Sequence, residues 1–374
     1  MNSKERVLAA INHKPVDRLP LDLGSTNCTT MTRYAYNRLK EKLGIEKPDV
    51  LMMEDFQIAA IDEEVLKLLN IDTRPVYGLT PRFEREVVDE RTYYDHFRKK
   101  FYMSEDAYYY TIIENPLADM ETVEEIEENY VWPNPYNEKT IEGIKERAKQ
   151  LHEENEYAII GDIVDSGIFE PAWYIRGMEN FLMDLLVNKE VAHYIMTKML
   201  EFQKGRYEYF LNEVGEYLDI VFVGDDLATE QTTIMSIDTY REMVKPYQKE
   251  YFDFIKSKTK AKLLYHSCGN ITPFIEDLIE IGVDLLNPVQ VSAQGMDTIS
   301  LKQKYGDSIG FWGAIDTNYV LPKGTVEEVE AEVRKRIKEL GPTGYIIGPV
   351  HDVQPDVPPE NILALYEAAY KIGR

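Results

Sequence analysis

The stretch Lys262–Asn270, with the sequence KLLYHSCGN, decides the fold. Its first part, Lys262–Tyr265, is a short and mostly apolar run, and a polar segment with a glycine follows it. Such a run is typical of a parallel β-strand that is buried on both faces. The sequence therefore predicts a buried strand whose end carries polar side chains.

Similar runs recur along the chain and alternate with longer segments that carry apolar residues every three or four positions. This alternation is typical of repeated βα units. An early strand followed by Gly-x-Gly-x-x-Gly is absent, so a closed (β/α)8 TIM barrel is favoured over an open doubly wound sheet. An eighth strand is expected near Pro75–Tyr77. The other strands are expected at Leu19–Leu23, Tyr157–Val164, Ile220–Val223, Lys262–Tyr265, Val283–Leu286, Ile309–Trp312 and Gly344–Ile347.

One helix has clear boundary signals. Thr325 with Glu328 three residues later predicts a capping box at its start, and Gly341-Pro342 predicts its end. The chain of 374 residues is expected to be one barrel domain over 1–374, since α/β barrels are long single units. An insertion at about 83–117 interrupts the pattern with aromatic residues on both sides of a polar turn, which predicts an inserted β-hairpin. The insertion would be either a solvent-exposed addition to the barrel or a lid over the substrate.

Charge and composition exclude some classes of partner. The net charge is −24, with 66 acidic against 42 basic residues, so a nucleic acid backbone would be repelled. The longest apolar runs fall far short of the roughly 20 residues of a membrane span, and the N-terminus lacks an apolar signal segment. Two cysteines build no disulfide framework, so a reducing, cytoplasmic compartment is expected. A homodimer stays open, because one sequence does not separate interface from core.

His266 and Cys268 are the candidates with the most specific chemistry. Side chains two apart on a strand point to the same face, so both can converge at the C-terminal end, where barrel enzymes keep their active sites. An imidazole and a thiol are two of the three protein ligands of a catalytic zinc site. The alternative is a buried structural pair. His351, after the last strand, is the expected third ligand, with Cys28 and a carboxylate of Asp225 or Asp226 as competitors.

Acidic and amide side chains also recur at the ends of strands. Such groups either surround a polar catalytic bowl or cap the following helix. Asp22, Asp225 and Asp226 are the expected catalytic candidates. The expected substrate-binding candidates are Asp162, Asn287, Gln290 and Asp316.

The chain resembles the uroporphyrinogen decarboxylase superfamily over nearly its full length. The resemblance is carried by Arg6–Ala10, Pro15–Pro20, Gly224–Leu227, Gly348–His351 and Pro358–Asn361. It implies a distorted (β/α)8 barrel. Decarboxylases of this family carry an arginine-rich segment after the first strand that binds the acetate and propionate groups of the porphyrinogen. Here that segment, Leu23–Cys28, has no arginine, which argues against porphyrinogen decarboxylation.

The His266-x-Cys268 motif is similar instead to the zinc methyltransferase branch, whose members exchange methyl groups with a corrinoid protein. That branch usually supplies its third ligand as a cysteine near the C-terminus, where this sequence has His351. The resemblance implies a Zn²⁺-dependent methyltransferase with two partners, a corrinoid (cobalamin) protein and a small methyl donor or acceptor. The aromatic insertion favours a methoxylated aromatic donor, as in an O-demethylase.

Two other functions stay open. One is a metal-free decarboxylase or lyase on the same barrel, with Asp22 and His351 as polar catalytic groups. The other is a non-catalytic barrel that binds a corrinoid or tetrapyrrole.

Overall fold

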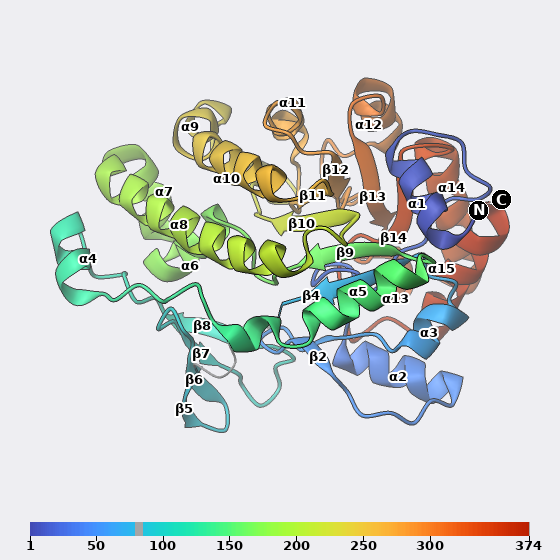
Figure 1. Ribbon diagram of the computed structural model, residues 1–374, viewed down its shortest axis with the longest axis horizontal. Helices are drawn as coiled ribbons and strands as arrows, with labels where there is room; N and C mark the ends of the chain where they lie inside the picture. Colours follow the sequence, from blue (N-terminus) through green and yellow to red (C-terminus); the bar gives the residue numbers. More distant parts are fainter. Residues whose placement is uncertain (79–84, 374) are drawn as a thin grey trace.

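A parallel β-sheet forms the centre of the molecule (Figure 1). The computed structural model describes residues 1–78 and 85–373. Neighbouring strands of this sheet are all parallel, as the alternation of short apolar and longer amphipathic segments predicted. In spatial order the strands are β14 (Tyr345–Pro349), β13 (Gly310–Ile315), β12 (Leu285–Asn287), β11 (Lys262–His266), β10 (Ile220–Gly224), β9 (Ala158–Asp162) and β4 (Thr73–Tyr77).

The segment around Leu21 joins the two edges of this sheet. The N–H of Asp22 donates to the carbonyl of Ile347 on β14 (2.8 Å), and the N–H of Asp72, just before β4, donates to the carbonyl of Leu21 (2.9 Å). The predicted TIM-barrel fold is confirmed, but the expected strand Leu19–Leu23 is reduced to an isolated bridge between Leu21 and Ile347. The cause is local: Pro20 has no N–H, and the N–H of Leu21 donates to the Asp72 carboxylate (2.8 Å) instead of to a strand.

Inward-facing side chains fill the barrel with the period of two that strands impose. Phe222, Leu264 and Leu285 belong to one buried cluster on three adjacent strands. Val7 and Ile11 of helix α1 (Ser3–Ile11) also belong to this cluster. Two positions beyond Leu264 and Leu285 on the same face are His266 and Asn287, so the filled interior ends in polar groups.

Helices cover the outside of the sheet (Figure 1). None in the described ranges is both long and apolar enough to cross a membrane. Of the helices, α4 (Val123–Asn129) lies away from this sheet (Figure 1). The other helices of the described residues beyond α1 are α2 (Arg33–Leu43), α3 (Glu63–Leu68), α5 (Ile144–Glu154), α6 (Phe169–Arg176), α7 (Met178–Val187), α8 (Lys189–Val214), α9 (Ile237–Met243), α10 (Lys245–Lys258), α11 (Ile275–Glu280), α12 (Thr298–Tyr305), α13 (Val320–Lys323), α14 (Val326–Leu340) and α15 (Pro359–Ile372), with 3-10 turns η2 (Glu138–Ile141) and η3 (Thr272–Phe274).

The capping box predicted for α14 is present. The Thr325 side chain accepts from the N–H of Glu328, and the Glu328 carboxylate accepts from the N–H of Thr325. The helix ends at Leu340, directly before Gly341. Both helix boundaries were therefore readable from four residues, since caps are local interactions.

The insertion is larger than the single hairpin that was expected. It is a separate antiparallel sheet of β5 (Glu86–Asp89), β6 (Thr92–Tyr94), β7 (Lys100–Tyr102) and β8 (Thr111–Glu114). The tyrosines of Tyr108–Tyr110 lie in the connection between β7 and β8 and not in a strand. Residues 83–84 of the expected insertion lie outside the described residues. A third sheet, also antiparallel, consists of β1 (Met31–Thr32), β3 (Ile58–Ala59) and β2 (Leu51–Met53).

Asp72 is the ionic centre of the barrel closure, and its removal tests the closure. Its buried carboxylate accepts from Arg6 (2.7 Å), from Arg18 (2.7 Å) and from the N–H of Leu21. We expect Asp72→Asn to lower the free energy of unfolding by about 3–5 kcal/mol, because the buried Arg18 loses its counter-charge and Arg6 keeps only the more exposed Asp17. Urea denaturation measures this loss.

The matched control is Asp17→Asn, which also pairs with Arg6 (2.7 Å) but has a side chain 44% exposed. We expect it to cost less than about 1 kcal/mol. Equal losses in the two variants would contradict the role assigned to Asp72.

Candidate metal centre

The pairing of three strands brings polar residues to one level of the barrel. Gly224 on β10 lies beside His266 on β11, and His266 lies beside Asn287 on β12. Parallel strands end at the same edge of a sheet, so this level is the C-terminal mouth of the barrel. The predicted location of the site therefore agrees with the strand register.

The His266 imidazole is held in one orientation. Its Nδ1 lies 2.5 Å from Oδ1 of Asn287, whose amide nitrogen in turn donates to the carbonyl of Trp312 (3.4 Å). Because the Asn287 oxygen accepts, Nδ1 carries the proton and Nε2 keeps its lone pair. Burial and then the nearby His351 lower the pKa of His266, which favours the neutral ring. A neutral imidazole with a fixed free Nε2 is the state that binds a metal ion.

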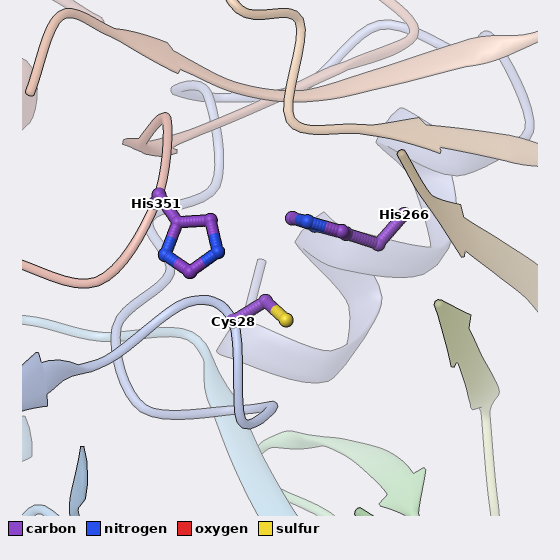
Figure 2. Close-up of side chains that lie close together, drawn as sticks. All are labelled: Cys28, His266 and His351. Carbon is purple, nitrogen blue, oxygen red and sulfur yellow. The ribbon is translucent and has the colours of Figure 1, made fainter. Parts of the chain in front are cut away.

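Two groups of potential ligands share His266. In the first, ligand atoms of Cys28, His266 and His351 all lie within 4.8 Å of one another, and Figure 2 shows these side chains around one space. In the second, the atoms of Asp226, His266 and Cys268 do so. Cys268 Sγ lies 3.5 Å and Asp226 Oδ1 4.0 Å from His266 Nε2. The mouth thus gathers two sulfurs, two imidazoles and a carboxylate.

The structure divides the expected trio of His266, Cys268 and His351 between these two groups. The N–H of Cys268 donates to Asp226 (2.7 Å), which ties Cys268 to the loop after β10. His351 follows β14, on the far side of the sheet order. Cys28, the competitor in the sequence interpretation, is the thiol that lies with both histidines.

The loop that carries Cys28 is fixed by Asp162. The fully buried Asp162 carboxylate accepts from the N–H groups of Asn27 (2.8 Å) and Val164 (2.6 Å). Burial raises the pKa of Asp162 to about 6. Burial also raises the pKa of the Cys28 and Cys268 thiols well above the usual range, so metal binding must displace a proton from a thiol.

Asp225 anchors the first turn of α6. It accepts from the N–H groups of Phe169 (3.0 Å) and Glu170 (2.6 Å) and from the Gln248 amide (3.2 Å), and burial raises its pKa to about 6. Asp225 does not line the cavity described below, but it fixes Glu170, which does.

The other predicted polar residues also make contacts within the protein. Asp22 is fully buried and accepts from Thr73 (2.5 Å) and Trp312 (2.8 Å). Asp316 accepts from the N–H groups of the turn that follows it, at Asn318 (2.7 Å) and Tyr319 (3.1 Å).

Gln290 accepts from the N–H of Gly269 (2.7 Å) and donates to Glu230 (2.9 Å). It lines a neighbouring hollow together with Cys268 and His351. Of the seven predicted acids and amides, Asp226 is the one that lines the main cavity, while Asn287 reaches it through His266.

A cavity of about 290 Å³ opens in front of the ligand groups. Most of the residues that line this cavity were not predicted from the sequence. Tyr109 is contributed by the insertion and donates to Gln354, so the run Tyr108–Tyr110 was a usable signal. Glu170 had no local signal, because its position depends on Asp225. The lining consists of Asn27, Cys28, Met53, Phe56, Ile58, Tyr109, Asp165, Ser166, Gly167, Glu170, Tyr174, Phe222, Gly224, Asp226, His266, His351, Asp352 and Gln354.

Two titratable groups of the wall have shifted pKa values. Burial and the nearby Asp226 raise the pKa of Glu170 well above its usual range, and Tyr174 donates to this carboxyl group (2.5 Å). Although burial opposes it, the hydrogen bond and charge of Asp352 raise the pKa of His351. The wall therefore combines a carboxyl group and an imidazole whose pKa values are both raised.

Comparison with known proteins fits this architecture. Residues 100–372 match the uroporphyrinogen decarboxylase (URO-D) family model. The chain belongs to the URO-D family. The family predicted from the sequence is thereby confirmed.

Two similar curated proteins are named for different activities. One is the uroporphyrinogen decarboxylase of Chlorobium limicola, 24% identical, with 48% of each chain covered. Another is the methylated-thiol–coenzyme M methyltransferase of Methanosarcina mazei, 25% identical, with 54% of this chain and 50% of the relative covered. The chain thus spans about half the length of the curated relatives it matches. A solved methyltransferase from Methanosarcina mazei has the same fold, with a TM-score of 0.67, 17% identity and 99% of both chains covered.

The Asn287 hydrogen bond gives a test of the candidate metal centre. We expect Asn287→Ala to weaken the binding of added Zn²⁺, used as a probe, about 10- to 100-fold, because the His266 ring loses the acceptor that fixes its tautomer. Competition with a chromophoric chelator measures the affinity. Asn361→Ala is the matched control, since Asn361 is also buried but donates to backbone carbonyls near α13. The same loss in both variants would mean that the effect comes from the fold alone.

Proposed function

We propose that this URO-D family member is a zinc-dependent methyltransferase that moves a methyl group between a small substrate and a corrinoid protein. The observation that carries the proposal is the fixed lone pair of His266 Nε2 beside two thiols and a second imidazole. Nitrogen and sulfur donors are the set that zinc prefers.

The geometry of the best-defined pair fits zinc. Cys268 Sγ and His266 Nε2 are 3.5 Å apart. With usual zinc bond lengths, a sulfur and a nitrogen of one tetrahedral site lie about 3.5 Å apart. We propose His266 and Cys268 as two ligands, and His351 or Cys28 as the third.

Zinc held there would supply Lewis acidity toward the heteroatom that carries or accepts the methyl group. The chain's own residues supply the setting. Asn287 orients the His266 ring, and Asp162 holds the loop of Cys28. The rings of Phe56, Tyr109, Tyr174 and Phe222 line the cavity, which supports a donor that packs against aromatic faces, such as a methoxylated aromatic compound.

Relatives support the reaction class. The methyltransferase from Methanosarcina mazei shares the fold along the whole chain, and the methylated-thiol relative shares a quarter of the aligned sequence. A metal-free decarboxylase that uses Asp22 and His351 is less well supported, because Asp22 is buried away from the cavity. The other alternative, a non-catalytic barrel that only binds a corrinoid or tetrapyrrole, would show no catalytic turnover.

Metal analysis and methyl transfer test the proposal together. We expect about one zinc per chain in protein purified without chelator, by mass spectrometry of the metal. We expect His266→Ala and Cys268→Ala to lose most of the zinc and, with it, the conversion of cob(I)alamin to methylcobalamin by a panel of methyl donors, followed by its absorbance change.

His152→Ala is the control, because His152 is an exposed residue of α5 and belongs to neither group of potential ligands. It should keep both zinc and activity. A zinc-free wild-type protein that decarboxylates a carboxylic acid would contradict the proposal, and so would a zinc-loaded protein that methylates no corrinoid.

A further inference from the structure

The inserted sheet of β5 to β8 is packed into the barrel at the turn between β6 and β7. Phe97 in this turn is 2% exposed and belongs to the same buried cluster as Phe202 of α8. The two rings are in edge contact, with centroids 4.8 Å apart. The hydroxyl of Tyr130 donates to the carbonyl of Phe97 (2.8 Å). Lifting the insertion off the barrel would expose a buried aromatic ring to water, which is unfavourable.

A buried lysine adds an ionic contact to the same attachment. Lys99 lies directly before β7, its side chain is 5% exposed, and its Nζ is 3.4 Å from a carboxylate oxygen of Asp95. The ammonium group also lies 5.3 Å from the ring centroid of Tyr174 on α6. Although burial opposes it, the charges of Asp95 and Asp165 raise the pKa of Lys99. Because Tyr174 and Asp165 line the cavity, the insertion supports this part of the wall from behind.

The connection between β7 and β8 forms part of the cavity wall itself. Tyr109 lines the cavity, and its hydroxyl donates to the side chain of Gln354 in the loop that follows β14. The Gln354 amide donates in turn to the carbonyl of Asp352 (3.0 Å). The ring of Tyr109 is therefore held in place by the segment that also carries His351.

The same connection fixes a second ring of this wall. Phe56 lies in the turn between β2 and β3 and also lines the cavity. Its neighbour Asp55 accepts from the N–H of Tyr110 through its carbonyl (2.9 Å) and from Arg85 through its carboxylate (2.6 Å). The ring centroids of Phe56 and Tyr109 are 6.3 Å apart, and the ring planes are inclined by 57°. Both rings are thus positioned by contacts between the insertion and the barrel loops.

The cavity beside these rings has room for one small ring compound. Its volume of about 290 Å³ is at the low end of the range for small-molecule sites, which is roughly 300–1,000 Å³. Rings in fixed positions accept a further flat ring in offset or edge-to-face contact, at centroid distances of roughly 4.5–7 Å. A puckered saturated ring or a short thioether cannot make these contacts.

We propose that the insertion is a fixed wall of the cavity and not a lid, and that Tyr109 is the residue through which it selects a methyl donor with a flat aromatic ring. This inference rests on the proposed function and specifies how its donor is chosen. The ring of Tyr109 contacts the donor, and its hydroxyl, bonded to Gln354, keeps the ring in place. Because the wall is formed before the donor binds, no free energy is spent on ordering it.

Binding of matched probes to the protein as purified tests the role of Tyr109. 3-Methoxyphenol and 3-methoxycyclohexanol carry the same substituents, but only the first has a flat aromatic ring, and 2-(methylthio)ethanol represents small methylated thiols. By isothermal titration calorimetry we expect 3-methoxyphenol to bind about tenfold more tightly than either of the others. Tyr109→Leu should reduce this preference to less than about threefold, whereas Tyr109→Phe keeps the ring and should retain most of it.

Tyr108→Leu is the matched control for the loss of one tyrosine. Tyr108 is 50% exposed, packs against Tyr34 with centroids 5.0 Å apart, and is not among the lining residues. It should leave the preference unchanged. Equal binding of the three probes, or the same loss in Tyr108→Leu as in Tyr109→Leu, overturns the proposal. So does a Tyr109→Phe variant without any preference, because the ring would then not be the selecting group.

Hydrogen exchange followed by mass spectrometry tests whether the wall is fixed. We expect the exchange rates of the backbone amides of β6 and β7 to change less than about twofold when 3-methoxyphenol binds, because their turn is already packed in the core. A larger slowing on binding would identify a lid that closes over the donor, and the fixed wall would be wrong.

The outcomes also separate this inference from the proposed function. If 3-methoxyphenol is preferred through Tyr109 but no donor methylates cob(I)alamin, the fixed wall stands and the proposed reaction is wrong. If 2-(methylthio)ethanol methylates cob(I)alamin as readily as 3-methoxyphenol, and Tyr109→Leu changes neither rate, the reaction stands and selection by Tyr109 is wrong.

Discussion

The in-register parallel pairing of β10, β11 and β12 is the constraint on which the candidate site depends. It places Gly224, His266 and Asn287 side by side at the barrel mouth. A shift of one residue would turn His266 away from the interior and separate it from Asn287. The same period of two that packs Leu264 and Leu285 inside therefore also aims the imidazole. The same strand register is therefore required both to pack the barrel core and to orient the candidate metal ligand His266.

Buried carboxylates do most of the positioning around this core. Asp72 joins the closing segment to two arginines, Asp162 holds the loop of Cys28, and Asp225 holds the first turn of α6. Each accepts backbone N–H groups that would otherwise be unpaired in a buried loop. Acids at strand ends are thus needed to build the mouth of the barrel, which is why their position alone does not identify a catalytic residue. Asp226 differs from them because it lines the cavity beside His266.

The sequence predicts what local rules control. Strands β9 to β14 follow from periodicity over a few residues, and the cap at Thr325 follows from a local pair of hydrogen bonds. His266 and Cys268 converge as predicted, but not as two positions of one strand, because β11 ends at His266 and Cys268 lies in the loop that follows. The segment Leu19–Leu23 departs from the rule because Pro20 and Asp72 remove its ladder bonds. Which thiol lies with His351 depends on loops that are more than 300 residues apart, such as the bond from Thr30 to Asp352 (2.9 Å). Pairwise spacing carries no information about such contacts.

The loop after the closing segment connects the metal centre to the charge of the cavity. The family resemblance assigns arginines to this position in decarboxylases, whereas Leu23–Cys28 supplies a thiol and an unpaired amide oxygen. Replacing cationic side chains there has two effects at once. It removes the counter-charges that a polycarboxylate substrate needs, and it leaves a cavity whose described lining has carboxyl groups but no lysine or arginine. The two groups of potential metal ligands, which share His266, lie beside these carboxyl groups. The barrel therefore determines where the chemistry occurs, and the side chains of this one loop help to determine which substrates can enter.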